Sequence, residues 1–179
     1  PVKVEQAAEF RYRNPIINKN DLVIAISQSG ETADTLAAVK EAKKKGVKVV
    51  SICNVVSSAI ARETGRGVYL HAGPEIGVAS TKAFTCQVTI LLMMALKIGR
   101  SNRYPLYEGE QFAKWIDNIP KLADEVLNQN EQIKKIAKKI YKQENAFFIG
   151  RSFLYPVALE GALKLKEISY IHAEGYHAS

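Results

Sequence analysis

A lysine stands between two glutamates on one face of a predicted helix. Glu160, Lys164 and Glu167 follow the spacing i, i+4, i+7, so their side chains lie within an arc of about 60°. An acid and an amine held together in a cleft can move protons on and off a carbon atom. A structural ion-pair stripe is the alternative, because Glu160 and Lys164 have the spacing of an i,i+4 salt bridge. The residues taken alone favour the ion pairs.

A short segment rich in hydroxyl groups, residues 27–32, is a second candidate. Its sequence is Ser-Gln-Ser-Gly-Glu-Thr, and it stands between a predicted buried strand and a predicted helix. In a doubly wound sheet, ligands bind at the carboxyl ends of strands. A helix N-terminus offers unpaired N–H groups and a partial positive charge to a phosphate. The glycine motifs of dinucleotide and P-loop sites are absent. An anion site and an ordinary capped turn are both compatible with this pattern.

A third candidate, residues 75–82, leads into a long predicted helix. Its sequence is Glu-Ile-Gly-Val-Ala-Ser-Thr-Lys, and Gly77 with its small neighbours allows a tight backbone at the helix start. These residues either shape a ligand pocket or allow close packing. Their spacing does not separate the two possibilities.

Histidine and serine patterns elsewhere define no site. His-Ala-Glu at residues 172–174 resembles the start of a zinc-deaminase signature, but the accompanying P-C-x-x-C is missing. The spacing of His71, His172 and His177 matches no metal site. Ser27 and Ser29 lack the G-x-S-x-G pattern of a hydrolase nucleophile. We therefore predict no metal ion and no cofactor.

The formal charge of +7 is concentrated in two places. One is the lysine triplet at residues 43–45. The other is a predicted helix over residues 133–142, whose lysines take the faces left free by apolar residues, as on a solvated helix surface. No nucleic-acid reader motif accompanies the charge, so we expect no nucleic-acid partner. A mildly basic balance suits anionic, phosphorylated substrates.

The cysteines and the apolar runs indicate a cytoplasmic protein. Cys53 and Cys86 stand in apolar segments without disulfide-framework spacing, which fits a reducing compartment. The longest apolar run, residues 88–96, falls short of the roughly 20 residues that span a bilayer. We therefore expect no association with a membrane.

The chain alternates short apolar runs with helical periodicity, which predicts an α/β fold with a doubly wound parallel sheet flanked by helices. The run at residues 22–26 is continuous, as in a strand buried on both faces. Residues 107–142 are predicted as two helices, divided near residues 118–120. The other predicted strands are residues 48–52, 67–71 and 146–150, and the other predicted helices are residues 32–45, 58–63, 80–98 and 156–171.

The same three candidate segments resemble motifs of a known family. Residues 27–35 resemble the phosphate-binding signature of SIS (sugar isomerase) domains. Residues 75–84 and residues 158–175 are similar to the glucosamine-6-phosphate synthase family (glutamine–fructose-6-phosphate aminotransferases, isomerizing), and residues 9–13 add a further match. The likeness covers the whole chain in the expected order. It outweighs the purely structural interpretation of the stripe at Glu160, Lys164 and Glu167.

The resemblance implies tandem SIS domains that are incomplete at both ends of this chain. Residues 1–105 would belong to the first SIS domain, residues 106–142 to a helical connection, and residues 143–179 to the start of the second. The glutaminase domain and a later histidine motif of such enzymes have no counterpart here. The fragment alone is therefore expected to bind sugar phosphate at most.

The resemblance also implies site residues. Val78 and Ser80 would line the sugar. Glu167 would be the base that moves a proton between C1 and C2 of the substrate, and Lys164 would assist the proton transfers. The sugar phosphate would be held by four residues of the hydroxyl-rich segment, Ser27, Gln28, Ser29 and Thr32.

The implied partners are fructose 6-phosphate, glucosamine 6-phosphate, the glutaminase domain of the same parent chain, and a second copy in a homodimer of the complete protein. Three other functions remain as alternatives. They are a non-aminating phosphosugar isomerase, an SIS regulator that binds a phosphosugar without turnover, and an SIS-type sugar-amine deaminase or deglycase.

Overall fold

The computed structural model describes residues 2–179, which form two compact units. The first unit runs to Glu75 and includes Thr81–Ala95, and the second comprises Ile76–Ser80 and Leu96–Ser179. Each unit is described by itself below.

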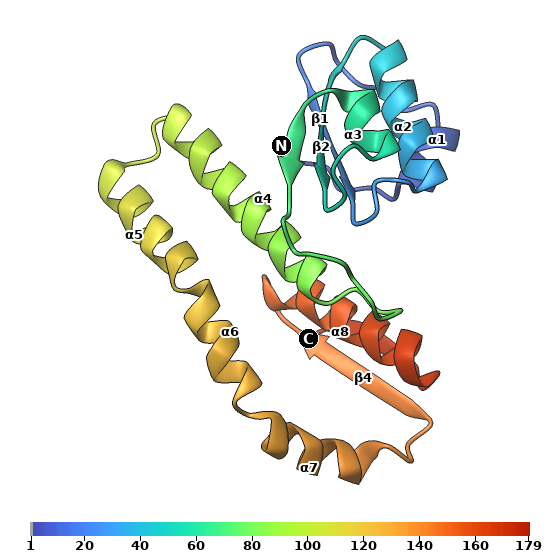
Figure 1. Ribbon diagram of the computed structural model, residues 1–179, viewed down its shortest axis with the longest axis vertical. Helices are drawn as coiled ribbons and strands as arrows, with labels where there is room; N and C mark the ends of the chain where they lie inside the picture. The colour runs from blue at the N-terminus through green and yellow to red at the C-terminus, as the bar shows by residue number, and fades with distance from the viewer. Residues whose placement is uncertain (1) are drawn as a thin grey trace. The chain divides into compact units, whose positions relative to one another are not determined.

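The first unit contains a three-stranded parallel sheet in the order β1-β2-β3 (Figure 1). The strands are β1 (Leu22–Ser27), β2 (Lys48–Cys53) and β3 (Gly67–Tyr69). Helices α1 (Ala7–Tyr12), α2 (Ala33–Lys44) and α3 (Ala59–Thr64) lie on one side of β1 and β2. The register pairs Leu22 with Lys48 and Ser27 with Cys53, so both strands end at the same edge of the sheet.

Two apolar clusters hold this unit together. One buries Ala25, Val39, Ala42, Val49, Cys53 and Ile60 between the sheet and the helices α2 and α3. The other packs helix α4 (Lys82–Ser101) through Ile90 and Leu91 against Ile52 and Leu70. The prediction that β1 is buried on both faces is right for Ala25 but wrong for Ile26, which is 40% exposed.

Helix α4 is also long and apolar enough, by length and composition, to cross a membrane. The sequence-based reasoning missed this, because it measured a single apolar run and not the whole helix. Within the first unit, Ile90, Leu91 and Met94 of α4 pack on the sheet. That is the ordinary use of an apolar helix in an α/β fold.

The second unit contains a parallel pair of strands, β4 (Asn145–Gly150) and β5 (His172–His177), covered by helix α8 (Leu154–Ser169). Ala158 and Ala162 of α8 are buried. A Cβ atom at Gly161 would stand 2.8 Å from the Phe148 ring, so the absence of a side chain there allows α8 to lie close to β4. Strand β5 was not predicted, because His, Glu and Gly carry little strand propensity.

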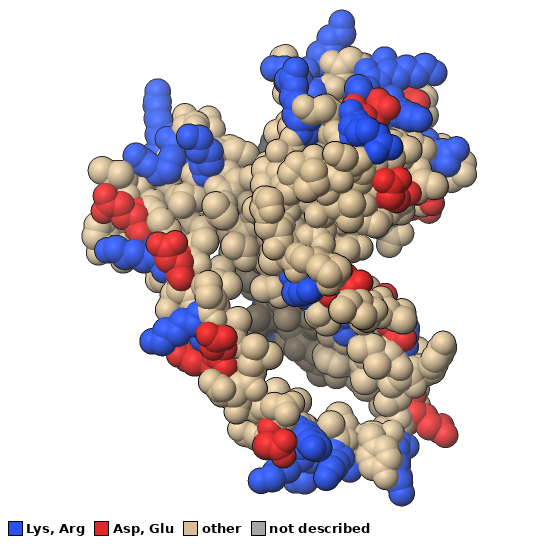
Figure 2. All heavy atoms as spheres, viewed as in Figure 1, with Lys and Arg blue, Asp and Glu red and all other residues tan. Residues whose placement is uncertain are grey.

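Three helices lie between α4 and β4, where the sequence predicted two. They are α5 (Leu106–Asp117), α6 (Ile119–Leu127) and α7 (Asn130–Ile140). The break near residue 118 was predicted, and the break after Leu127 was not. The lysines of α7 are exposed and visible in Figure 2, as expected for a solvated helix surface. Its isoleucines are also about half exposed, at 50–53%.

We expect Ile52→Ala to lower the free energy of unfolding by about 3 kcal/mol, because this fully buried side chain leaves a cavity between the sheet and α4. Ile26→Ala on the neighbouring strand is the matched control, and a change below about 1 kcal/mol is expected there because the side chain is already partly in solvent. Urea unfolding followed by circular dichroism measures both. Equal losses in the two variants would contradict this description of the core.

Candidate functional site

The hydroxyl groups of residues 27–32 are held by contacts within their own loop. Ser27, the last residue of β1, is 6% exposed, and its Oγ accepts a hydrogen bond from the Gly30 N–H at 3.0 Å. The same Oγ lies 3.2 Å from Thr32 Oγ1. The Ser29 Oγ accepts a hydrogen bond from the Glu31 N–H at 3.1 Å. We call residues 27–32 the hydroxyl loop.

Among residues 2–179, no capping side-chain hydrogen bond is made at the N-terminus of α2. Thr32 is the N-cap residue, with φ −62° and ψ 117°, yet it makes no side-chain hydrogen bond to the first turn of the helix. The sequence left an anion site and a capped turn equally open, and this geometry argues against the capped turn. Free backbone N–H groups at a helix start are the donors that bind phosphate elsewhere.

Two carboxylates, one in the hydroxyl loop and one in the first turn of α2, are engaged with other groups. Asp34, in the first turn of α2, pairs with Arg11 at 3.4 Å. Glu31 accepts a hydrogen bond from the Ala59 N–H at 2.8 Å, at the start of α3. Both interactions give the carboxylates positive partners, which reduces their repulsion of an anion at α2.

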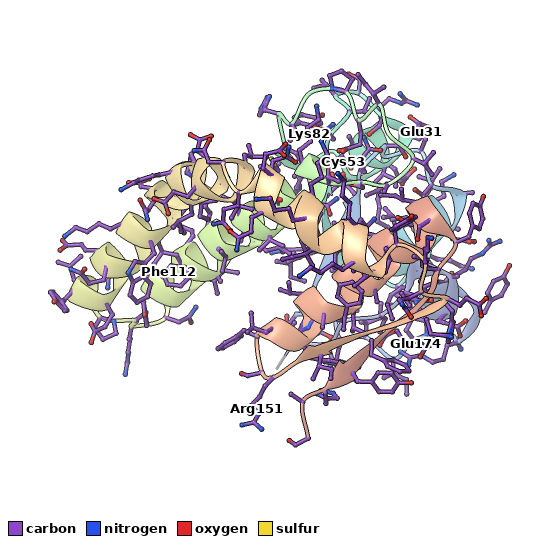
Figure 3. All side chains as sticks on the ribbon, turned by 90° about the horizontal axis from the view of Figure 1, so that it is seen from below. Glu31, Cys53, Lys82, Phe112, Arg151 and Glu174 are labelled. Atoms are coloured by element: carbon purple, nitrogen blue, oxygen red, sulfur yellow. The ribbon has the colours of Figure 1, made fainter. Side chains whose placement is uncertain are left out.

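The thiol beneath the loop is uncharged. Burial raises the pKa of Cys53 above its ordinary value of 9.0, and the hydroxyls of Ser58 and Ser51 oppose that rise. Cys53 lies at the end of β2, and Figure 3 shows it in the interior of the first unit, with Glu31 at the surface. A protonated thiol at this position adds no negative charge under a bound anion.

The backbone of Gln28 ties the hydroxyl loop to a neighbouring loop. Its carbonyl accepts a hydrogen bond from the Asn54 N–H at 3.0 Å, which links the hydroxyl loop to the segment after β2. Asn54 in turn accepts from the Ala72 N–H at 3.0 Å and donates to the Gly73 carbonyl at 2.7 Å. The loops that follow the three strands are therefore tied together at one edge of the sheet.

Glu75 occupies the start of α4. Its carboxylate accepts hydrogen bonds from the Thr81 N–H at 3.0 Å, the Ala83 N–H at 3.1 Å and the Thr81 hydroxyl at 3.2 Å. The pKa of Glu75 is held below its ordinary value of 4.5, chiefly by the hydrogen bond from the Thr81 backbone. Burial opposes this, and the bonds from the Ala83 backbone and the Thr81 hydroxyl add to it. This helix start is therefore already satisfied by a carboxylate of the chain.

Residues 76–80 bulge between the two ends of this cap. Val78 is 94% exposed, and Ser80 is partly buried. The hydrogen bond between Glu75 and the Thr81 N–H joins the two residues that flank this segment in the chain.

Lys164 contacts both glutamates of its helix face. Its Nζ lies 2.7 Å from Glu167 Oε2 and 3.3 Å from Glu160 Oε1. Burial alone lowers the pKa of Lys164, but the hydrogen bonds to Glu167 and Glu160 outweigh it, so the pKa is raised above the ordinary 10.5. Lys164 is therefore an ammonium at neutral pH. We call Glu160, Lys164 and Glu167 the acid–amine stripe.

The predicted site residues thus fall into three groups. The hydroxyl loop belongs to the first unit, and the acid–amine stripe and residues 76–80 belong to the second. Sequence reasoning gave no role to Glu31, Asn54 or Ser58. Position was a signal for two of them, because Glu31 stands inside the candidate segment 27–32 and Asn54 follows the predicted strand at residues 48–52 by two residues. No group of three metal-binding side chains occurs among residues 2–179.

The parallel sheet and the helices that cover it define an α/β domain, and a family model matches it. The SIS domain model matches residues 1–97 and 139–179. This chain belongs to the SIS domain family, and the predicted fold class is confirmed.

Individual relatives indicate a narrower family than the SIS domain model does. Over the full length of this chain, the glutamine–fructose-6-phosphate aminotransferase (isomerizing) of Chlorobaculum tepidum is 56% identical and that of Bacteroides thetaiotaomicron is 54% identical. The chain spans only 29% of the length of each. The predicted resemblance to this enzyme family is confirmed.

Solved structures with the same fold include this enzyme and two proteins with other names. The C-terminal domain of glucosamine-fructose-6-phosphate aminotransferase from Francisella tularensis is 43% identical, with a TM-score of 0.95 over 99% of this chain and 51% of that chain. A putative phosphosugar isomerase from Clostridium difficile is 28% identical with a TM-score of 0.81, over 92% of this chain and 48% of that chain. A glucosamine-6-phosphate deaminase from Thermotoga maritima is 25% identical with a TM-score of 0.75, over 96% of this chain and 50% of that chain.

The Glu75 cap predicts an acid-sensitive stability. Because the pKa of Glu75 is lower in the folded chain than in the unfolded chain, its stabilising effect is complete above pH 4.5 and is lost as the pH falls through the lower folded-state value. Glu75→Gln should therefore lose less stability than the wild type between about pH 6 and about pH 3. Urea midpoints at the two pH values measure this, with Glu110→Gln on α5 as the control. A variant that loses as much stability as the wild type would contradict the cap.

Proposed function

We propose that this chain is the sugar-phosphate-binding isomerase part of a glutamine–fructose-6-phosphate aminotransferase. The parent enzyme would convert fructose 6-phosphate and glutamine-derived ammonia to glucosamine 6-phosphate. The observation that carries the proposal is the hydroxyl loop, whose donors surround a helix N-terminus that no side chain caps. The full-length similarity to this enzyme family supports it.

The phosphate would be bound at the start of α2. The hydroxyls of Ser27, Ser29 and Thr32 and the amide of Gln28 would donate to its oxygens, together with backbone N–H groups of the first turn. Ser27 and Thr32 now hydrogen-bond to one another, so a phosphate would exchange that contact for charge-assisted bonds, which are stronger. Val78 and Ser80 would line the sugar.

The proton transfers would fall to the acid–amine stripe. Glu167 would take a proton from C1 and return it at C2, or the reverse, and the ammonium of Lys164 would stabilise negative charge that develops on the substrate oxygen. Glu167 Oε2 now bonds to the Lys164 Nζ at 2.7 Å, so this carboxylate would turn away from Lys164 to reach a substrate proton.

The proposal includes an organisation and partners. We assign residues 1–105 to a first SIS domain, residues 106–142 to a helical connection and residues 143–179 to the start of a second SIS domain. The glutaminase domain of the same parent chain would supply ammonia, and the complete protein would be a cytoplasmic homodimer. The similarity to the aminotransferases supports this organisation.

A sugar-amine deaminase is the second candidate function. It is favoured by the similarity to the Thermotoga maritima deaminase, which shares the fold over 96% of this chain. Both activities use a phosphate site and a proton-transferring base. A glutaminase domain in the full-length protein, and synthesis that depends on glutamine, would decide for the aminotransferase.

The phosphate site is tested by titrating the chain with fructose 6-phosphate and with fructose, followed by calorimetry. We expect binding of fructose 6-phosphate alone, and an affinity reduced about tenfold or more in Ser27→Ala/Thr32→Val, because hydrogen bonds to a charged group are lost. Ser51→Ala is the matched control, since Ser51 is a buried serine of β2 that bonds to Thr64 at 2.8 Å and not to the hydroxyl loop. Equal binding of fructose, or equal weakening by Ser51→Ala, would refute the assignment.

The base is tested in the full-length protein. Glu167→Gln should lower glucosamine 6-phosphate formation about a thousandfold or more while the affinity for fructose 6-phosphate stays within about threefold, because the proton transfer is lost and the phosphate contacts remain. Lys166→Gln, an exposed change on the same helix, is the control. Retained synthesis in Glu167→Gln would assign the base to another residue.

A further inference from the structure

Glu31 is a carboxylate inside a loop that is proposed to bind an anion. Taken alone, its negative charge opposes phosphate binding, and a loop selected only for charge would not contain it. The structure places its Oε1 2.8 Å from the Ala59 N–H, in the first turn of α3, which is 28 residues away in the sequence. Figure 3 shows the Glu31 side chain at the surface of the first unit.

A second bond joins the same two segments. The Gly30 carbonyl accepts from the Ile60 N–H at 2.9 Å. Consecutive N–H groups of α3, those of Ala59 and Ile60, are therefore bound by consecutive residues of the hydroxyl loop. The two bonds form a latch between the loop and α3.

The latch lies where the loop has little freedom. Gly30 has φ +68°, and a Cβ atom there would stand 2.0 Å from the Ser58 Oγ. Ser58 is 2% exposed, and its hydroxyl lies close enough to the Cys53 thiol to oppose the rise in the pKa of Cys53, but it meets the geometry of a hydrogen bond with none of residues 2–179. Ser58 thus fills the space beside Gly30 without a hydrogen bond to it. The hydrogen bonds between the hydroxyl loop and α3 are therefore those accepted by Glu31 and by the Gly30 carbonyl.

The latched conformation is the one that presents the phosphate donors. With Gly30 held, its N–H points at the Ser27 Oγ, which in turn lies beside Thr32 at the start of α2. A loop released from α3 would have to order itself again on binding, at a cost in affinity.

We propose that Glu31 is a positioning residue, which latches the hydroxyl loop to the start of α3 and thereby keeps the proposed phosphate site formed before ligand arrives. This inference rests on the proposed function for its ligand, but the latch itself is a property of the ligand-free chain. In this role Glu31 favours anion binding, whereas its negative charge taken alone would oppose it.

Two variants separate position from charge. Glu31→Gln removes the charge but keeps an oxygen that can accept from the Ala59 N–H, whereas Glu31→Ala removes both. If Glu31 acts by position, Glu31→Ala should weaken binding of inorganic phosphate and of fructose 6-phosphate about tenfold. Glu31→Gln should bind both at least as tightly as the wild type. If Glu31 acts by charge alone, both variants should bind equally and more tightly than the wild type, and the inference is overturned.

Glu63→Ala is the matched control for the loss of one negative charge near α3. Glu63 belongs to α3 and pairs with Lys43 at 2.7 Å, with no bond to the hydroxyl loop. Weakening in Glu63→Ala equal to that in Glu31→Ala would remove the case for a latch.

Amide hydrogen exchange of the ligand-free chain tests the latch without any ligand. Exchange at Ala59 and Ile60 should be about tenfold faster in Glu31→Ala and restored in Glu31→Gln, while the amides of β1 stay unchanged. Unchanged exchange at Ala59 overturns the inference whatever the binding data show. A wild type that binds no phosphate, with the expected exchange, would overturn the proposed function and leave the latch supported.

Discussion

The parallel register of β1 and β2 is the constraint on which the rest of the first unit depends. It sets Ser27 opposite Cys53, so the chain leaves both strands at the same edge of the sheet. The hydroxyl loop and the segment that leads to α3 then start side by side, which brings Glu31 within 2.8 Å of the Ala59 N–H. A shift of one residue would turn Ser27 to the other face of the sheet and separate these groups.

Two helix starts of the first unit, those of α2 and α4, bind different groups. At α4, Glu75 satisfies the free N–H groups from within the chain, and the depressed pKa of Glu75 records that contact. At α2, the N-cap Thr32 makes no such bond, and the neighbouring hydroxyls bond to one another. A helix start without a capping side chain has donors to offer to an anion, and a capped one does not. This contrast distinguishes α2 from α4. The N-cap residue of α1, Gln6, also makes no side-chain hydrogen bond, but no hydroxyl-rich loop precedes α1.

The sequence predicted local features well and long-range ones poorly. The strand at residues 22–26, the hydroxyl loop and the helix that follows were predicted because pattern and turn chemistry act within a few residues. The contacts of Lys164 with Glu160 and Glu167 follow from helical spacing, and both were found. The bond from Ala59 to Glu31 joins residues 28 apart and has no local signal. Strand β5 was missed because its pairing with β4, and not its composition, makes it a strand.

The acid–amine stripe can be a structural ion-pair network and a proton-transferring site at the same time. Lys164 is partly buried, and an ammonium there is costly unless carboxylates accompany it. The carboxylates of Glu160 and Glu167 on the same face stabilise the ammonium. The raised pKa of Lys164 shows that this stabilisation is larger than the cost of burial. One lysine cannot neutralise two glutamates, so the stripe keeps a surplus of negative charge. In the proposed mechanism, that surplus lets Glu167 leave the ammonium for a substrate proton while Glu160 keeps Lys164 paired.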